Sequence, residues 1–147
     1  MKKIVQNNKE GSRMENKDLI EKALYAREKS YSPYSKFKVG ACLEAEDGSI
    51  YCGCNIENAS YPVTNCAERT AFFQAISQGV RKFRKIAIVG GHDRATEFCP
   101  PCGVCRQVMM EFCNPETFEI ILGKEDLSYQ IYTLKELLPL GFGPNHL

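Results

Sequence analysis

Two cysteine motifs contain the residues whose types and spacing could do chemistry. Cys66-Ala67-Glu68 places a thiol two residues before a carboxylate, and Pro101-Cys102-Gly103-Val104-Cys105 contains a C-x-x-C pair. At the start of a helix, the thiols of Cys102 and Cys105 would lie one turn apart on the same side, which is the short arm of many zinc sites. Alone, such a pair also fits a structural zinc knuckle, a redox dithiol or a chance occurrence.

The combination of C-x-E with a downstream P-C-x-x-C is the signature of zinc-dependent deaminases. Cys66, Cys102 and Cys105 would supply three thiolates and leave the fourth position of the metal open, as a catalytic site requires. Neither histidine lies in the motifs, so a cysteine takes the position that histidine fills in other deaminases. The sequence therefore predicts one zinc ion per chain, and His92 is interpreted as a strand-end or surface residue.

Cys99 forms a second C-x-x-C with Cys102 and could be a fourth, closing ligand. It precedes Pro100 and Pro101 and so lies outside the predicted helix, which favours a buried or partly exposed free thiol. The eight cysteines are interpreted as metal ligands plus buried thiols rather than as a disulfide framework, because we expect a cytoplasmic, reducing location.

Two charged residues follow the first cysteine ligand. Glu68 can face the open metal position, where it would take a proton from water and pass it to a substrate ring and then to a departing amine. Three thiolates give Zn²⁺ a net negative site, which Arg69 and the positive ends of two helices could offset. The alternatives are an exposed helix glutamate and a solvated or salt-bridged arginine.

Hydrophobic periodicity predicts the elements that position these motifs. Helices are expected from Asn16 to about Ser30, from Cys66 to about Gln78 and from Gly103 to Phe112, with a helical turn at Leu134–Leu138; strands are expected at Val39–Ala45, Ile50–Ile56, Ile86–Val89, Phe118–Leu122 and, briefly, Tyr129–Tyr132. Asp47-Gly48 indicates a hairpin between the first two strands. A hairpin followed by alternating helices and strands predicts an α/β fold: a three-layer α/β/α sandwich with a mixed, roughly five-stranded sheet.

The length and net charge of the chain limit the number of domains and the classes of partner that we expect. The 147 residues suit one domain, which we place at residues 15–147. Residues 1–14 are expected to be a disordered extension; the alternatives are an alternative translation start at Met14 and the remnant of a tag. A net charge of +1 gives no electrostatic reason to expect a nucleic-acid partner. No apolar run suits a signal peptide or a membrane span.

A wider set of motifs resembles the short, homotetrameric cytidine deaminases, from about Leu19 to the C-terminus. The matching residues are Phe37, Asn55-Ile56-Glu57-Asn58-Ala59, Tyr61-Pro62, Cys66-Ala67-Glu68-Arg69-Thr70-Ala71, Pro101-Cys102-Gly103-Val104-Cys105-Arg106-Gln107-Val108 and Leu138-Pro139-Leu140-Gly141-Phe142-Gly143-Pro144. The resemblance implies zinc-dependent hydrolysis of free cytidine and 2'-deoxycytidine to uridine and 2'-deoxyuridine plus ammonia, in pyrimidine salvage.

The resemblance also implies roles for individual residues. Asn55 and Glu57 would hold the sugar hydroxyls, and because they are two apart at a strand end they should point the same way. Phe37 would pack on the pyrimidine ring, and the backbone of Ala67 and Cys102 would meet polar atoms of the base. Locally, residues 55–60 also fit a plain polar turn, and Phe37 fits a core position.

In that family the active sites are completed by neighbouring subunits. This implies a homotetramer in which Phe142, Ala59 and Tyr61 reach across an interface. Family members commonly have serine where this chain has Pro100. A proline still supplies a backbone carbonyl to a substrate amine but supplies no hydroxyl.

Three other functions are weighed against this one. A deaminase of another aminopyrimidine, such as blasticidin S, is expected to lack the Asn55-Ile56-Glu57 segment. A non-catalytic zinc module is disfavoured by the glutamate beside the cysteines and by the near-zero net charge. A deaminase of polynucleotides is disfavoured because no basic cluster marks a strand-binding groove.

Overall fold

The computed structural model describes residues 13–147, so the predicted extension lies mostly outside the described residues. Its last two residues contact the domain. Arg13 pairs with Glu119, and the backbone N–H of Met14 donates to the buried Glu44 carboxylate at 2.7 Å. Arg13 and Met14, which the predicted extension includes, thus contact the strands of the domain that contain Glu119 and Glu44.

Five strands form one mixed sheet in the order β2-β1-β3-β4-β5. The elements are α1 (Asn16–Arg27), β1 (Lys38–Ala45), β2 (Ile50–Cys54), α2 (Ala67–Ser77), β3 (Phe83–Gly91), α3 (Gly103–Phe112), β4 (Glu119–Gly123), β5 (Tyr129–Thr133) and α4 (Leu134–Leu137), with short 3-10 helices at Tyr61–Val63 and Pro144–His146. Only the β3–β4 pair is parallel. Gly48 takes the positive φ of 87° that the predicted hairpin turn requires.

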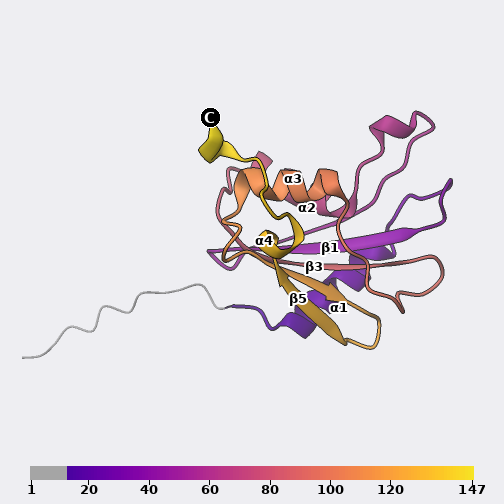
Figure 1. Cartoon of the computed structure of the whole chain (residues 1–147). Helices are drawn as coiled ribbons and strands as arrows, with labels where there is room; N and C mark the ends of the chain where they lie inside the picture. Colours follow the sequence, from indigo (N-terminus) through magenta and orange to yellow (C-terminus); the bar gives the residue numbers. More distant parts are fainter. Residues whose placement is uncertain (1–12) are drawn as a thin grey trace, which may run out of the picture.

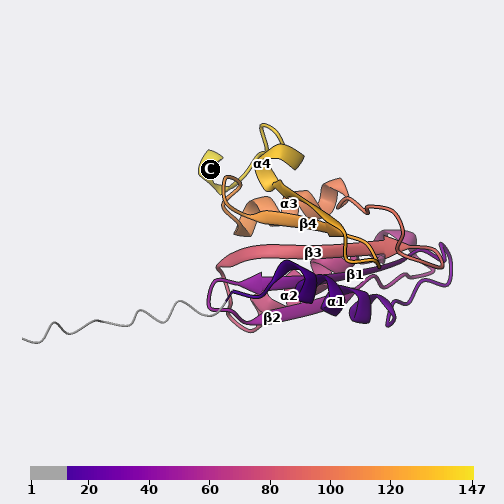
Figure 2. The same ribbon diagram turned by 90° about the horizontal axis from the view of Figure 1, so that it is seen from below.

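Helices cover both faces of the sheet, which confirms the predicted three-layer α/β/α fold. Figure 1 shows α2 and α3 above the sheet and α1 below it, and Figure 2 shows the strands side by side across the middle layer. The interior strand β1, which lies between β2 and β3, is buried on both faces: Ala41 and Leu43 belong to the core under α2 and α3, whereas Cys42 belongs to the core under α1. The alternation of side chains along a strand explains this division.

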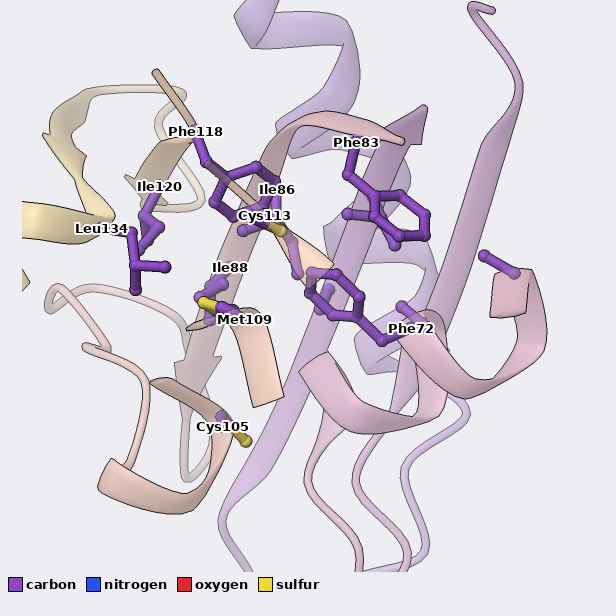
Figure 3. Close-up of a cluster of buried hydrophobic side chains, with 14 of the residues drawn as sticks. Phe72, Phe83, Ile86, Ile88, Cys105, Met109, Cys113, Phe118, Ile120 and Leu134 are labelled. Atoms are coloured by element: carbon purple, nitrogen blue, oxygen red, sulfur yellow. The ribbon is translucent and has the colours of Figure 1, made fainter. Parts of the chain in front are cut away.

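The larger of the two cores supports the helices that carry the cysteine motifs. Figure 3 shows Phe72 of α2 and Met109 of α3 packed over the strand residues Ile86 and Ile88, with Cys105 at one end of the cluster. All five side chains are no more than 1% exposed. The first turn of α3 is thereby fixed against the sheet by the same packing that forms the core.

Arg27 closes the first helix and ties together the strand ends beside Phe37. Its guanidinium, which is almost fully buried, donates to the carbonyls of Lys38 (3.2 Å), Gly91 (2.9 Å) and His92 (3.1 Å). The α-helix ends at Arg27 rather than at about Ser30, because the next backbone bonds, from Lys29 to the Ala26 carbonyl and from Ser30 to the Arg27 carbonyl, span three residues instead of four.

One cysteine pair departs from the expectation of ligands plus free thiols. Cys42 and Cys52 form a disulfide, with Cα atoms 4.1 Å apart, because the hairpin register places them directly opposite each other in β1 and β2. The other six cysteines are free, and no disulfide framework exists among the described residues 13–147. In this range, too, every helix is too short or too polar to cross a membrane.

Candidate metal centre and active site

Both cysteine motifs sit at helix starts that face each other. Cys66 is the N-cap residue of α2 and Cys102 that of α3, each with extended backbone angles (φ −76°, ψ 157° and φ −66°, ψ 164°). In this conformation an N-cap side chain turns back over the first helical turn, where free N–H groups and the positive helix end favour a negative ligand. The two helix starts therefore create an environment for thiolates.

The three predicted ligands form one cluster. The Sγ atoms of Cys66, Cys102 and Cys105 all lie within 4.8 Å of one another, and those of Cys66 and Cys102 are 3.7 Å apart. A tetrahedral zinc with Zn–S bonds of about 2.3 Å separates its sulfurs by about 3.8 Å. The cluster fits zinc in both ligand type and spacing, and it leaves a fourth position without a protein ligand from this group.

Glu68 lies against this cluster in a buried position. Its side chain is on the first turn of α2, and the Cys105 thiol donates to its Oε2 at 3.2 Å. Burial raises the pKa of Glu68, and the negative charge of Cys66 raises it further. A carboxylate in this environment takes up a proton more readily than a free glutamate, which suits a proton carrier.

Arg69 contacts the ligands directly, as the sequence predicts. Its Nη2 donates to Cys66 Sγ at 3.3 Å. Hydrogen bonds from Cys105 and Arg69 lower the pKa of Cys66 to about 5, whereas the bond to Cys66 and burial raise the pKa of Cys105. The low pKa of Cys66 favours its thiolate form, and metal binding to all three sulfurs releases the protons that remain on them.

Cys99 lies outside the cysteine cluster and next to Phe37, the residue predicted to pack on the pyrimidine ring. Burial raises the pKa of Cys99 to about 12, which makes it a poor source of a thiolate ligand. A Cβ added at Gly90 would come within 2.7 Å of Cys99 Sγ and 3.2 Å of the Phe37 ring, so both side chains pack over this glycine. Together with His92 they line a cavity of about 490 Å³.

This packing of Cys99 against Phe37 is a feature that the sequence analysis missed. The sequence predicts a buried or partly exposed free thiol at Cys99, which is confirmed, but not its contact with Phe37, because no periodic pattern links residue 37 to residue 99. The glycine at position 90 was the available signal, since glycine in a strand often marks a close approach of other groups.

Asn55 uses its side chain mainly to hold the backbone around Phe37. Its Oδ1 accepts from the N–H of Val39 (2.9 Å) and from the Ser30 hydroxyl, and its Nδ2 donates to the Phe37 carbonyl (2.8 Å). These bonds extend the β1–β2 pairing by one side chain. Oδ1 already accepts two hydrogen bonds and Nδ2 already donates one. The side chain of Asn55 therefore has one remaining N–H that could donate to a ligand.

Glu57 is positioned by the loop that precedes Phe37. Its Oε1 accepts from the N–H groups of Tyr34 (2.9 Å) and Ser35 (3.1 Å). A hydrogen bond from the Ser35 side chain lowers the pKa of Glu57 most, and the two backbone bonds lower it further. The Ser35 hydroxyl in turn accepts from the N–H of Phe37 at 3.0 Å. Ser35 thus contacts both Phe37 and Glu57, two of the predicted substrate contacts. The backbone N–H groups of Tyr34 and Ser35 both donate to Oε1 of Glu57, and neither uses Oε2.

The remaining predicted contacts lie at the surface or in the first turn of α2. Ala67 is fully buried directly after Cys66, and Ala59 is exposed. Tyr61 is 69% exposed beside the Tyr34 ring, and Phe142 is 58% exposed and stacks on His146. Within the described chain, Phe142 lines neither the cavity at Phe37 nor the one at Glu57.

Comparisons with known proteins agree with this site. Residues 13–120 match the family model described as the cytidine and deoxycytidylate deaminase zinc-binding region. The chain is 48% identical to a cytidine deaminase of Sporosarcina psychrophila, over 91% of this chain and 96% of that protein. It is 50% identical to a cytidine deaminase of Halalkalibacterium halodurans, over 88% and 95%.

Solved structures give the same result for the fold. The structure is similar to the cytidine deaminase from Burkholderia pseudomallei, with a TM-score of 0.80 and 47% identity over 88% of this chain and all of that one (100%). It is also similar to the Mycobacterium tuberculosis cytidine deaminase, with a TM-score of 0.76 and 35% identity over 89% and 99%. Motif, geometry and overall likeness lead to one conclusion: the chain belongs to the cytidine deaminase family of zinc-dependent enzymes.

Proposed function

We propose that this protein hydrolyses free cytidine and 2'-deoxycytidine to uridine and 2'-deoxyuridine with release of ammonia. The observation that carries the proposal is the placement of Glu68, a buried carboxylate whose Oε2 lies 3.2 Å from the sulfur of the ligand Cys105. A carboxylate at this distance from a metal ligand can reach a molecule that faces the open metal position.

Proton transfer by Glu68 accounts for the stoichiometry of the reaction. Zinc, when held by Cys66, Cys102 and Cys105, acidifies water and polarises the bond that is attacked. The oxygen of one water molecule becomes the C4 carbonyl oxygen. Glu68 transfers one proton of that water molecule to N3 of the pyrimidine and the other to the amino group, which leaves as ammonia. Exclusion of solvent around Glu68 favours the protonated form that this second transfer needs.

The contacts proposed for the nucleoside come from Phe37, Asn55, Glu57 and the backbone beside two of the cysteines. Phe37, which packs with Cys99 over Gly90, provides a ring for the pyrimidine to stack on. The free Oε2 of Glu57 and the spare N–H of Asn55 provide an acceptor and a donor for sugar hydroxyls. The backbone of Ala67 and Cys102 is proposed to contact the base.

We further propose a homotetramer with shared active sites. Large apolar side chains that a monomer would normally bury are exposed near the site and on the C-terminal segment, namely Tyr61, Val63, Leu140 and Phe142. Phe142, Tyr61 and Ala59 are proposed to contact substrate in a neighbouring subunit. Sedimentation equilibrium should give four times the chain mass of 16.6 kDa, and a monomeric mass at full activity would refute this part.

The decisive experiment for the reaction replaces Glu68. Glu68→Gln removes the proton carrier but keeps the size of the side chain, so we expect zinc content to stay at the wild-type level and turnover of cytidine to fall by at least about a thousandfold. Glu111→Gln, on the exposed face of α3, is the matched control and should deaminate normally. Turnover is measured as ammonia release from cytidine, deoxycytidine, cytosine and blasticidin S. Wild-type turnover by Glu68→Gln, or release from blasticidin S alone, would overturn the proposal.

A further inference from the structure

Two polar side chains directly after the ligand Cys105 hold backbone carbonyls from distant parts of the chain. Arg106 donates through Nε to the Pro101 carbonyl at 2.8 Å and through Nη1 to the Leu137 carbonyl at 2.5 Å. Gln107 donates through Nε2 to the Phe142 carbonyl at 2.8 Å. These bonds connect α3 both to the loop before Cys102 and to the segment after α4.

The loop before Cys102 is held by a hydrogen bond from the Arg106 side chain. Pro100 and Pro101 have no N–H groups, so neither can donate a backbone hydrogen bond that would anchor the loop. Arg106 holds the loop at two successive carbonyls, because its backbone N–H also donates to the Cys102 carbonyl at 3.0 Å. Two adjacent residues at the start of the metal motif are thus fixed to one residue on the first turn of α3.

Arg106 differs from Arg69 in what it contacts. Arg69 donates to a ligand sulfur, whereas the two side-chain hydrogen bonds of Arg106 both go to carbonyl oxygens. Within residues 13–147, Arg106 forms no ion pair. A half-buried guanidinium held by two carbonyls gives charge-assisted hydrogen bonds with fixed geometry, which suits positioning of a backbone segment.

The second carbonyl extends the connection to the C-terminal segment. Leu137 is the last residue of α4, and the chain from there reaches the close packing of Gly141 and Gly143 on Met110 of α3. A Cβ at either glycine would come within 3.2 Å or 3.1 Å of the Met110 side chain. One helix therefore supports two ligand cysteines on one side and the segment that presents Phe142 on the other.

We propose that Arg106 is a positioning residue for the metal site: by holding the Pro101 carbonyl it keeps Cys102 in the cluster, and by holding the Leu137 carbonyl it links the metal loop to the C-terminal segment. The inference concerns metal retention and goes beyond the proposed reaction. The kinetic part of its test relies on that reaction, and the metal-release part does not.

The test measures zinc release from the purified holoenzyme to a chromogenic chelator at neutral pH. For Arg106→Ala we expect release to be about ten- to a hundredfold faster than in the wild type, the range set by loss of a charge-assisted hydrogen bond. Arg106→Lys can reach one carbonyl but not both, so its rate should lie between those of the wild type and the alanine variant. Cytidine kcat should fall in the same order, with KM changed less than kcat.

Two controls separate positioning from general loss of a helix contact. Arg81, in the loop that follows α2, also donates to two carbonyls, those of Ile76 (2.7 Å) and Val80 (2.9 Å), and Arg81→Ala should release zinc at the wild-type rate. Gln107→Ala removes only the bond to Phe142 and should also retain zinc normally. Thermal melting of the zinc-free proteins checks that each variant folds.

The outcomes that overturn the inference are specific. They are wild-type zinc release by a folded Arg106→Ala, equal acceleration in Gln107→Ala or Arg81→Ala, or an Arg106→Lys variant no better than alanine when both are folded. If the alanine variant does not fold, the lysine variant alone decides, because its release rate must still exceed that of the wild type. Failure of the proposed reaction would appear instead as normal turnover in Glu68→Gln, with zinc release unaffected.

Discussion

The two helices that meet at the metal cluster begin alike and then use their side chains differently. Each starts directly after a ligand cysteine in extended conformation. In α2 the next charged residues, Glu68 and Arg69, turn toward the sulfur atoms. In α3 the next arginine, Arg106, turns away from the sulfurs and toward carbonyls of the surrounding chain.

This difference gives the two helices different roles at the site. The first turn of α2 carries the proposed proton carrier Glu68 and a positive charge, Arg69, beside a ligand sulfur, so we assign to it the chemistry at the metal. The first turn of α3 carries two ligands and anchors the loop that precedes them, so it sets their geometry. A metal site needs both, because ligands that are not held in place lose affinity even when their chemistry is correct.

The largest expected effect would come from removing a ligand. Cys105→Ser replaces a thiolate by a hydroxyl that zinc binds poorly, so we expect loss of both zinc and activity. Cys99→Ser is the matched control: its thiol lies outside the cluster, and zinc content should be unchanged. Metal analysis of the two purified proteins checks this, and loss of zinc in Cys99→Ser would make Cys99 a fourth ligand.

A smaller effect is expected from the arginine of α2. The hydrogen bond from Cys105 contributes most to the low pKa of Cys66, and Arg69 lowers it further by a hydrogen bond and by its charge; without Arg69 the pKa of Cys66 rises, so protons compete better with zinc. For Arg69→Gln we expect zinc affinity to drop about tenfold or more near pH 6 and to recover as pH rises toward 9. Zinc titrations at several pH values test this against Arg81→Gln. A pH-independent loss would mean that Arg69 acts by packing rather than by charge.

The smallest effect on the metal should come from a residue outside both helices. In Asn55→Asp, a carboxylate oxygen replaces the N–H that donates to the Phe37 carbonyl, so two acceptors would face each other. We expect KM for cytidine to rise about tenfold with zinc content unchanged. Asn58→Asp is the control, because that side chain only accepts a hydrogen bond, from the N–H of Ser60 at 2.8 Å. Steady-state kinetics decide, and equal KM values for the two variants would contradict the role of Asn55.

Most of the fold could be predicted because its elements have strong local signals. The α3 bounds, Gly103 to Phe112, follow from a cysteine N-cap preceded by two prolines and from the apolar spacing along the helix. The end of α1 was predicted about three residues too late, because the last turn closes with bonds that span three residues and has no glycine or proline to mark the change. The Cys42–Cys52 disulfide was missed for a similar reason, since pairing register decides which residues lie opposite each other.

The sequence by itself predicts the three candidate ligands and the proposed proton carrier Glu68. Cys102 and Cys105 are three residues apart, so one helical turn brings them to one side, and the C-x-E motif adds Cys66 and Glu68 without knowledge of distant residues. Only the tertiary structure decided that the two motifs meet, with sulfurs 3.7 Å apart across 36 residues of sequence. It also decided what Arg106, Asn55 and Cys99 contact, because their partners are brought together by the sheet and its core rather than by spacing along the chain.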